Sequence, residues 1–274
     1  MKTFLKSSTL AVALIALVIA CTRVPITGRK QLSLISNAQI MGMSFTSYKE
    51  FLDSNKVVSN GKDAEMIRRV GNRIKTAVEN YLIQNNYSQV IDGYQWQFEL
   101  VQSKDLNAWC MPGGKVVFYT GILPICQNEE GVAVVMGHEI AHAIASHGAE
   151  RMSQAYVAQG ITTAAAVGGM IATKNEQNGQ IIGQVVGAIT TGAYVLPNSR
   201  KQESEADKLG LIFMAMAGYN PQNSVEFWQR MAKAGQGGQK PPQWLSTHPS
   251  DETRISNLNA LMPKAMAYYQ AYNK

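Results

Sequence analysis

Two histidines and a glutamate interrupt an apolar stretch of the chain, and this feature limits the possible folds most strongly. Residues 132–144 read VAVVMGHEIAHAI, in which His138, Glu139 and His142 are the polar side chains. Apolar residues continue on both sides, so the stretch is predicted to form one buried helix. Burying an unpaired imidazole or carboxylate is costly, so these side chains need partners.

The spacing of the three polar residues is typical of a metal site. Each residue of an α-helix turns by ~100°, so His142 returns to the face of His138 and two neutral imidazoles converge on one ion. Glu139 lies beside that ion, where it can accept a proton from a metal-bound water. Gly137 favours close packing next to the metal. The alternative, surface or capping histidines beside a solvated glutamate, fits the apolar surroundings poorly.

A third ligand is needed, and the chain has only four histidines. On a continuing helix His147 would lie ~180° from His138, so it is not predicted to be a ligand. Glu203 and Asp207 are four residues apart and share a helix face, so one can bind the metal while the other orients a histidine. The alternative is a solvated acidic start of a helix, which the helix dipole favours.

The N-terminus resembles a targeting segment. Lys2 and Lys6 precede an apolar run over residues 10–20, shorter than the ~20 residues that a membrane span needs. The sequence Val-Ile-Ala-Cys that ends at Cys21 resembles the bacterial lipobox, which predicts cleavage before Cys21 and acylation of this residue. An ordinary signal peptide or an uncleaved anchor is the alternative.

Composition excludes several other classes of protein. The chain has 274 residues, of which 46% are hydrophobic and 16% are charged, as in ordinary globular proteins. Its net charge of +6 falls to +4 once Lys2 and Lys6 are removed, which is no footprint for nucleic acid. Three cysteines exclude a disulfide-dense scaffold. Cys110 and Cys126 are predicted to be either a disulfide or separate buried thiols.

Periodicity predicts a mostly helical chain. Two segments rich in small residues, 156–173 and 181–195, are each shorter than the ~20 residues of a membrane span. Closely packed helices or a mobile lid are predicted there, with a membrane hairpin or peripheral membrane contact as alternatives. The other predicted elements are helices over 37–51, 63–82, 128–153, 199–217, 223–234 and 251–262, strands over 94–101 and 115–119, and a loop over 235–243.

Four segments together resemble the HtpX/BepA/LoiP type of zinc metallopeptidases, which are gluzincins related to the CAAX prenyl protease. They are NAWCMPGGKVVFYTG (107–121), HEIAHAIASH (138–147), SRKQESEADKLG (199–210) and HPSDETRI (248–255). The resemblance covers residues 63–262 and is strongest to the small periplasmic lipoproteins. It implies an α+β, mostly helical, zincin-like fold with a small antiparallel sheet beside the HExxH helix. The predicted domains are a signal peptide (1–20), a lipid-anchored arm and helix (21–62) and the peptidase domain (63–274).

The resemblance also implies roles for single residues. His138, His142 and Glu203 would bind one Zn²⁺ per chain, Glu139 would be the general base, and Asp207 would orient a ligand histidine. An extended substrate would pair with an edge strand by backbone hydrogen bonds. That strand is predicted at Gly114, Lys115, Val116, Val117 and Phe118.

Two further residues have open roles. His248 is predicted to face the zinc, where it would block the fourth position or stabilise the transition state, with a structural loop contact as the alternative. For Arg254, in the last helix, an internal ion pair is favoured over contact with substrate.

The implied activity is that of a zinc-dependent endopeptidase of the cell envelope, in which Glu139 activates a zinc-bound water. Its predicted substrates are unfolded or misassembled envelope proteins, and the lipid at Cys21 would hold it at the outer membrane, facing the periplasm. The alternative is a chaperone or assembly factor with an autoinhibited zinc site.

Overall fold

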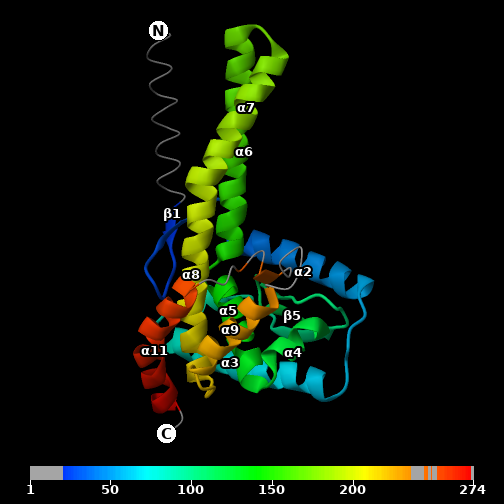
Figure 1. Ribbon diagram of the computed structural model, residues 1–274, viewed down its shortest axis with the longest axis vertical. Coiled ribbons are helices and arrows are strands. Elements are labelled where there is room, and N and C mark those ends of the chain that lie inside the picture. Colours follow the sequence, from blue (N-terminus) through cyan, green and yellow to red (C-terminus); the bar gives the residue numbers. More distant parts are fainter. Residues whose placement is uncertain (1–20, 236–243, 246–247, 249–251, 273–274) are drawn as a thin grey trace. The chain divides into compact units, whose positions relative to one another are not determined.

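The computed structural model describes residues 21–235, 244–245, 248 and 252–272 (Figure 1). The predicted signal peptide and almost all of the predicted loop over 235–243 lie outside these residues. The described chain forms two compact units. The hairpin unit contains residues 21–37 and 146–199, and the sheet unit contains residues 38–145 and 200–272. The domain boundaries drawn from the sequence stay predictions.

The sheet unit holds most of the helices and one three-stranded sheet. Its helices are α2 (Asn37–Ser54), α3 (Lys62–Gln84), α4 (Leu123–Cys126), α5 (Glu129–Ile144), α8 (Leu196–Met216, which begins in the hairpin unit), α9 (Asn223–Gly235) and α11 (Glu252–Tyr272). Its strands are β3 (Gln97–Val101), β4 (Ala108–Met111) and β5 (Lys115–Tyr119), with 3-10 turns η1 (Ser88–Ile91) and η2 (Thr120–Ile122). The prediction of a mostly helical fold with a small sheet is confirmed.

The sheet has the strand order β3-β5-β4. Strand β5 runs parallel to β3, with Gln97 opposite Lys115, and antiparallel to β4, with Met111 opposite Lys115. Strand β4 was not among the strands predicted from the sequence. At that turn Gly113 and Gly114 both have positive φ values, 88° and 81°, which favour glycine.

This strand order corrects the predicted substrate strand. The prediction placed the edge of the sheet at Gly114–Phe118, but β5 lies in the centre and pairs with a neighbour on each side. Its backbone groups are therefore already used by the sheet. Among the described strands, β4 is the edge strand that packs against α5.

Helix α5 lies at the centre of the sheet unit. Every residue from Gly131 to Ile144 is buried, and the helix packs against α3, α9 and β4. Helix α3 presents a four-residue apolar repeat to this core, and Gly71 allows close contact with the Phe98 ring, since a Cβ there would lie only 2.3 Å from it. Helix α5 is therefore the buried centre of the sheet unit, and the apolar face of α3 packs against it.

The predicted helix over 128–153 is two helices. Helix α5 ends at Ile144, and α6 (His147–Thr173) begins after Ser146, whose φ of 56° is left-handed. A left-handed residue cannot continue a right-handed helix. Neither glycine nor proline marks this break in the sequence, so local propensity did not reveal it.

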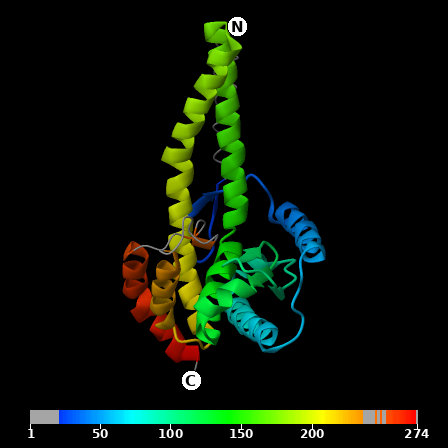
Figure 2. The same cartoon turned by 45° about the vertical axis from the view of Figure 1, so that its right-hand side comes forward.

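The hairpin unit joins a short β-ribbon to two long helices (Figure 2). Strands β1 (Cys21–Arg23) and β2 (Lys30–Leu32) are antiparallel. Helices α6 and α7 (Glu176–Thr190) lie side by side, and the π-helical turn η3 (Thr191–Val195) continues α7 into α8. These helices extend beyond the small-residue segments recognised in the sequence, so the expectation that each is too short to span a membrane is wrong.

Candidate metal centre

The HExxH motif places two imidazoles on one face of α5. The helix begins at Asn128, whose side chain accepts a hydrogen bond from the Gly131 N–H at 2.9 Å and caps the first turn. His138 and His142 are both buried, and their Nε2 atoms lie 3.1 Å apart. The predicted convergence of the two rings is therefore present.

A glycine contact brings α8 against the motif. A Cβ on Gly137 would lie 2.7 Å from the Gly210 carbonyl oxygen, and a Cβ on Gly210 would lie 2.7 Å from the His138 backbone nitrogen. Real Cβ atoms do not approach backbone so closely, so both positions require glycine at this separation. The close packing predicted at Gly137 is confirmed, and it brings the acidic face of α8 to the histidines.

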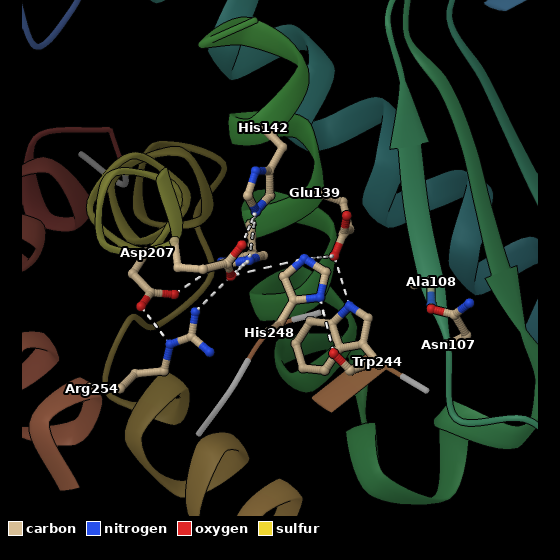
Figure 3. A network of polar contacts seen from close by, with 10 residues as sticks. Asn107, Ala108, Glu139, His142, Asp207, Trp244, His248 and Arg254 are labelled. Carbon is tan, nitrogen blue, oxygen red and sulfur yellow. Dashed lines mark hydrogen bonds and ion pairs between the residues drawn. The ribbon is translucent and has the colours of Figure 1, made fainter. Parts of the chain in front are cut away.

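Glu203 completes a set of converging ligand atoms. Its Oε2 lies 3.4 Å from His138 Nε2, and its Oε1 lies 3.4 Å from His142 Nε2. Together with His248, these residues form a buried group whose ligand atoms lie within 4.8 Å of one another (Figure 3). A tetrahedral zinc with bonds of ~2.0–2.1 Å holds its ligands ~3.3 Å apart. The three predicted ligands therefore fit zinc in both chemistry and spacing.

Asp207 lies one turn after Glu203 and approaches the other side of the His138 ring. The distance from Asp207 Oδ1 to His138 Nδ1 is 2.9 Å. A carboxylate in this position accepts the Nδ1–H and leaves Nε2 with its lone pair toward the ion, which is the arrangement that orients metal ligands in proteins. The structure thus gives Asp207 the geometry of an orienting residue and Glu203 that of a ligand.

Arg254 holds the two carboxylates from α11. Its Nε donates to Asp207 Oδ2 at 2.6 Å and its Nη2 donates to Glu203 Oε2 at 3.0 Å. The guanidinium is buried and lies 3.8 Å from the centre of the Trp228 ring. The internal ion pair favoured for Arg254 is present, and it compensates two buried negative charges.

The protonation of these groups follows from their partners. Burial lowers the pKa of His138, but the hydrogen bonds that its ring donates to the Asp207 and Glu203 carboxylates outweigh this and raise the pKa to about 9 in the metal-free protein. Burial raises the pKa of Glu203, but both histidines more than offset this, so its pKa lies below the ordinary range. Burial likewise opposes and Arg254 favours ionisation of Asp207, whose pKa is lowered. The carboxylates are therefore ionised at neutral pH.

His248 faces the same site from outside α5 and α8. Its Nε2 lies 3.9 Å from Glu203 Oε2, and its Nδ1 lies 3.1 Å from the Trp244 carbonyl oxygen. Donation of the Nδ1–H to this carbonyl leaves the Nε2 lone pair directed at the site. Burial lowers the pKa of His248 to about 3, so the ring is neutral, as a metal ligand must be. The placement near the predicted metal agrees with the expectation from the sequence.

Glu139 lies beside the ligands and has a partner that the sequence did not reveal. The Trp244 indole Nε1–H donates to Glu139 Oε1 at 2.8 Å, and His248 Nε2 lies 3.7 Å from the same oxygen. Trp244 stacks on Trp228, with ring centroids 5.0 Å apart. Neither tryptophan belongs to a spaced motif, so only the proximity of Trp244 to the HPSDETRI segment could have drawn attention to it.

Other candidate residues lie outside the group of metal ligands. Among the described residues, the cluster contains His138, His142, Glu203 and His248 but not His147, in agreement with its exclusion as a ligand. Cys110 and Cys126 are both free thiols, so no disulfide joins them. The side chain of Cys21 is not among those described, and its acylation stays a prediction.

Comparison with known proteins supports a metallopeptidase family, while the small periplasmic lipoprotein type within it stays a prediction. Residues 70–262 match the sequence model of Peptidase family M48. Mitochondrial metalloendopeptidase OMA1 of Saccharomyces cerevisiae is 35% identical over 195 residues, which cover 67% of this chain and 52% of the yeast protein. Metalloendopeptidase OMA1 of Bos taurus is 29% identical over 259 residues, or 91% of this chain and 47% of the bovine protein.

A bacterial relative is also similar. The beta-barrel assembly-enhancing protease of Yersinia pestis is 28% identical over 183 residues, which cover 65% of this chain and 37% of the relative. The chain thus spans about half the length of the mitochondrial relatives it matches.

Proposed function

Because the chain belongs to Peptidase family M48, we propose that it is a zinc-dependent endopeptidase of the bacterial cell envelope. The observation that carries this proposal is the position of Glu139 beside three buried, converging ligand atoms. His138, His142 and Glu203 would hold the ion. A zinc ion bound there would polarise the scissile carbonyl and lower the pKa of a water.

Glu139 would act as the acid and base of the reaction. Its carboxylate accepts a proton from the attacking water and later gives the proton to the departing amine of the cleaved peptide. The Trp244 N–H at 2.8 Å fixes the orientation of one carboxylate oxygen. Arg254 and Asp207 keep the His138 ring in its ligating tautomer and have no part in the proton transfer.

The free edge of β4 would hold the substrate in place of the predicted β5. This strand packs against α5, and the Leu106 carbonyl just before it accepts a hydrogen bond from the Trp244 N–H at 3.2 Å, so the edge begins beside the site. Pairing with an edge needs an extended peptide with free backbone groups. Peptides with alternate N-methylated backbone nitrogens should compete poorly for cleavage if this assignment is correct.

Unfolded or misassembled envelope proteins are the proposed substrates. The support is the need for an extended backbone, together with the similarity to the beta-barrel assembly-enhancing protease. Attachment through an acylated Cys21 to the outer membrane, on its periplasmic side, is part of the same proposal. Radiolabelled palmitate incorporation into the wild type but not into Cys21→Ser tests this attachment.

The substitution Glu139→Gln tests the activity directly. Loss of the carboxylate removes the general base, so casein cleavage should fall by about 10²- to 10⁴-fold while bound zinc stays near one per chain. Glu130→Gln is the matched control, because it makes the same change in the first turn of the same helix. Cleavage that survives in Glu139→Gln, or in the presence of a chelator, would refute the proposal.

A second function, a chaperone or assembly factor with a closed metal site, is favoured by one observation. His248 Nε2 lies in the ligand cluster and the Trp244 indole covers Glu139, so both residues occupy the space a substrate would need. Under the peptidase proposal, the wild type should cleave casein and His248→Ala should retain or raise that cleavage, whereas Trp244→Phe, which removes the hydrogen bond to Glu139, should lower it. If neither these variants nor the wild type cleaves casein, while the wild type prevents aggregation of an unfolded protein, the second function is correct.

A further inference from the structure

The hairpin of α6 and α7 exposes large apolar side chains along most of its length. No charged residue occurs between Arg151 and Lys174, or between Glu176 and Arg200. The exposed fractions reach 69% at Ile171 and 63% at Ile189. Other exposed apolar side chains on the two helices are Ile161, Val167, Ile181 and Val185.

The two helices are long enough to cross a lipid bilayer. Helix α6 has 27 residues, and the helical stretch from Glu176 to Met216 has 41. At ~1.5 Å per residue, α6 is ~40 Å long, more than the ~30 Å of a bilayer's hydrocarbon core. Only 6% and 11% of their most apolar windows are buried, whereas a core helix of similar composition would be mostly buried. Their apolar surface therefore lacks a cover among the described residues.

The core of a water-soluble protein buries large apolar side chains, whereas the contact between α6 and α7 buries glycines. The residues buried along the contact are glycines, at positions 169, 179 and 183. A Cβ on Gly179 would lie 2.5 Å from the Ala166 carbonyl oxygen, so the backbones are in direct contact. Gly179, Gly183 and Gly187 recur every four residues, the spacing that joins helices in membranes. Small residues thus bring the two backbones into contact, while most of the large apolar side chains lie outside that contact.

The exposed apolar side chains lie on both helices of the hairpin. Val167 and Ile171 are four residues apart on α6, and Ile181, Val185 and Ile189 follow at the same spacing on α7, so each set shares one helix face. A hairpin joined through glycines presents such faces outward, and acyl chains cover the outer faces of a hairpin that enters a bilayer.

The ends of the hairpin are polar. Lys174 and Glu176 lie at the tip. At the other end, Arg29 donates to both oxygens of Glu150 at 2.9 and 2.7 Å, and the Leu34 N–H donates to Ser153 Oγ at 2.9 Å. These bonds fix the hairpin to the arm whose first strand begins at Cys21. The predicted acylation site and the apolar helices therefore belong to one unit.

We propose that the hairpin of α6 and α7 inserts into the hydrocarbon interior of a phospholipid bilayer. The outward isoleucines and valines contact acyl chains, the glycines keep the two helices together, and the charged residues remain at the headgroups. This is a contact with the membrane in addition to the predicted acyl anchor. It does not depend on peptidase activity.

A fluorescent probe on the full chain tests the proposal. Val185→Cys carries a polarity-sensitive fluorophore on the hairpin, and Ile83→Cys carries it on α3, at positions 55% and 59% exposed. The unsubstituted chain gives the background, since burial raises the pKa of both Cys110 and Cys126 and slows their labelling. Each protein is mixed with phosphatidylethanolamine–phosphatidylglycerol vesicles that carry a spin-label quencher deep in the acyl chains.

The expected result is that the Val185 probe loses most of its emission and the Ile83 probe keeps it. Adding Ile171→Glu and Ile189→Glu to the Val185→Cys chain should restore emission, because charges oppose entry into hydrocarbon. Equal quenching at the two positions overturns the proposal. So does quenching that 1 M salt abolishes, which indicates adsorption to headgroups, or a blue-shifted Val185 probe without vesicles, which indicates association between copies of the chain.

Discussion

Helices α5 and α6 follow one another along the chain and are both rich in alanine, glycine and apolar residues, yet they have opposite surroundings. In α5 every residue from Gly131 to Ile144 is buried. In the outer two-thirds of α6 most residues are exposed, and Gly169 is the buried residue of that part. Composition therefore determined that both are helices, but not whether protein covers them.

The two units also differ in where their charged residues lie. The sheet unit buries Glu203, Asp207 and Arg254 together, in pairs at 2.6 and 3.0 Å. The hairpin has no charged residue between its base and its tip. A buried charge is tolerated where a partner is built in, whereas an apolar surface without charges suits a surrounding that offers no partners. Four changes test this difference, from the largest expected effect to the smallest.

The ion pair at the metal centre should be the most sensitive point. Arg254→Met keeps the volume of the side chain but removes the guanidinium that pairs with two buried carboxylates, so it should lower the free energy of unfolding by about 3–5 kcal/mol in urea denaturation. Arg69→Met, which removes the partner of Glu129 at the surface, is the control and should change the midpoint little. Equal effects of the two variants would mean that burial of the pair is unimportant.

Truncation of an apolar side chain should have the next largest effect, and it should destabilise the protein much more in α5 than in α6. Ile144→Ala opens a cavity in α5, where the side chain is 1% exposed, and should cost about 2–5 kcal/mol. Ile171→Ala in α6 should change the free energy of unfolding by less than about 0.5 kcal/mol. Both variants are measured by urea denaturation in one buffer that contains detergent. A large loss from Ile171→Ala would show that protein covers this surface.

Replacing glycine by alanine should change the free energy of unfolding in opposite directions in the two units. Gly210→Ala forces a Cβ against the His138 backbone and should lower the free energy of unfolding by about 1–3 kcal/mol. It should also weaken zinc binding, because α8 carries Glu203. Gly168→Ala on α6 meets nothing within 4 Å and should stabilise the helix by about 0.5–1 kcal/mol. Thermal unfolding followed by circular dichroism measures both, and a loss from Gly168→Ala would point to a close partner there.

The smallest effect concerns a buried thiol. Burial raises the pKa of Cys126 to about 12. The folded chain therefore keeps its proton above pH 9 while the unfolded chain loses it, so stability should fall as pH rises beyond that value. At pH 8 the native thiol should react with a disulfide reagent roughly a thousandfold more slowly than in urea. Rapid reaction in the native protein would place Cys126 nearer the surface than the core around α5.

The metal centre was largely predictable because its residues are paired by their spacing along single helices. His138 and His142 converge through one helical turn, and Glu203 and Asp207 share a face for the same reason. The distances then separated their roles, with Glu203 at 3.4 Å from both imidazoles and Asp207 at 2.9 Å from the far nitrogen of one. Trp244 was not predictable, because its bond to Glu139 joins residues 105 positions apart.

The order of the strands and the break between α5 and α6 were not predicted from the sequence. The strand predicted over 115–119 has the exact bounds of β5, but the order of strands depends on which strands pair, and β4 lies at the edge. The left-handed Ser146 carries no local signal, so one predicted helix became two.

The ligand types, the helices that carry them and the uncharged length of the hairpin follow from the order of the amino acids, because helical periodicity and charge spacing are local properties of the chain. Four other features depend on how the chain folds: Gly137 meets Gly210, Trp244 covers Glu139, β4 is the edge strand, and glycines face inward between α6 and α7. These are contacts between distant segments, and close packing of particular shapes, rather than any local preference, selects them.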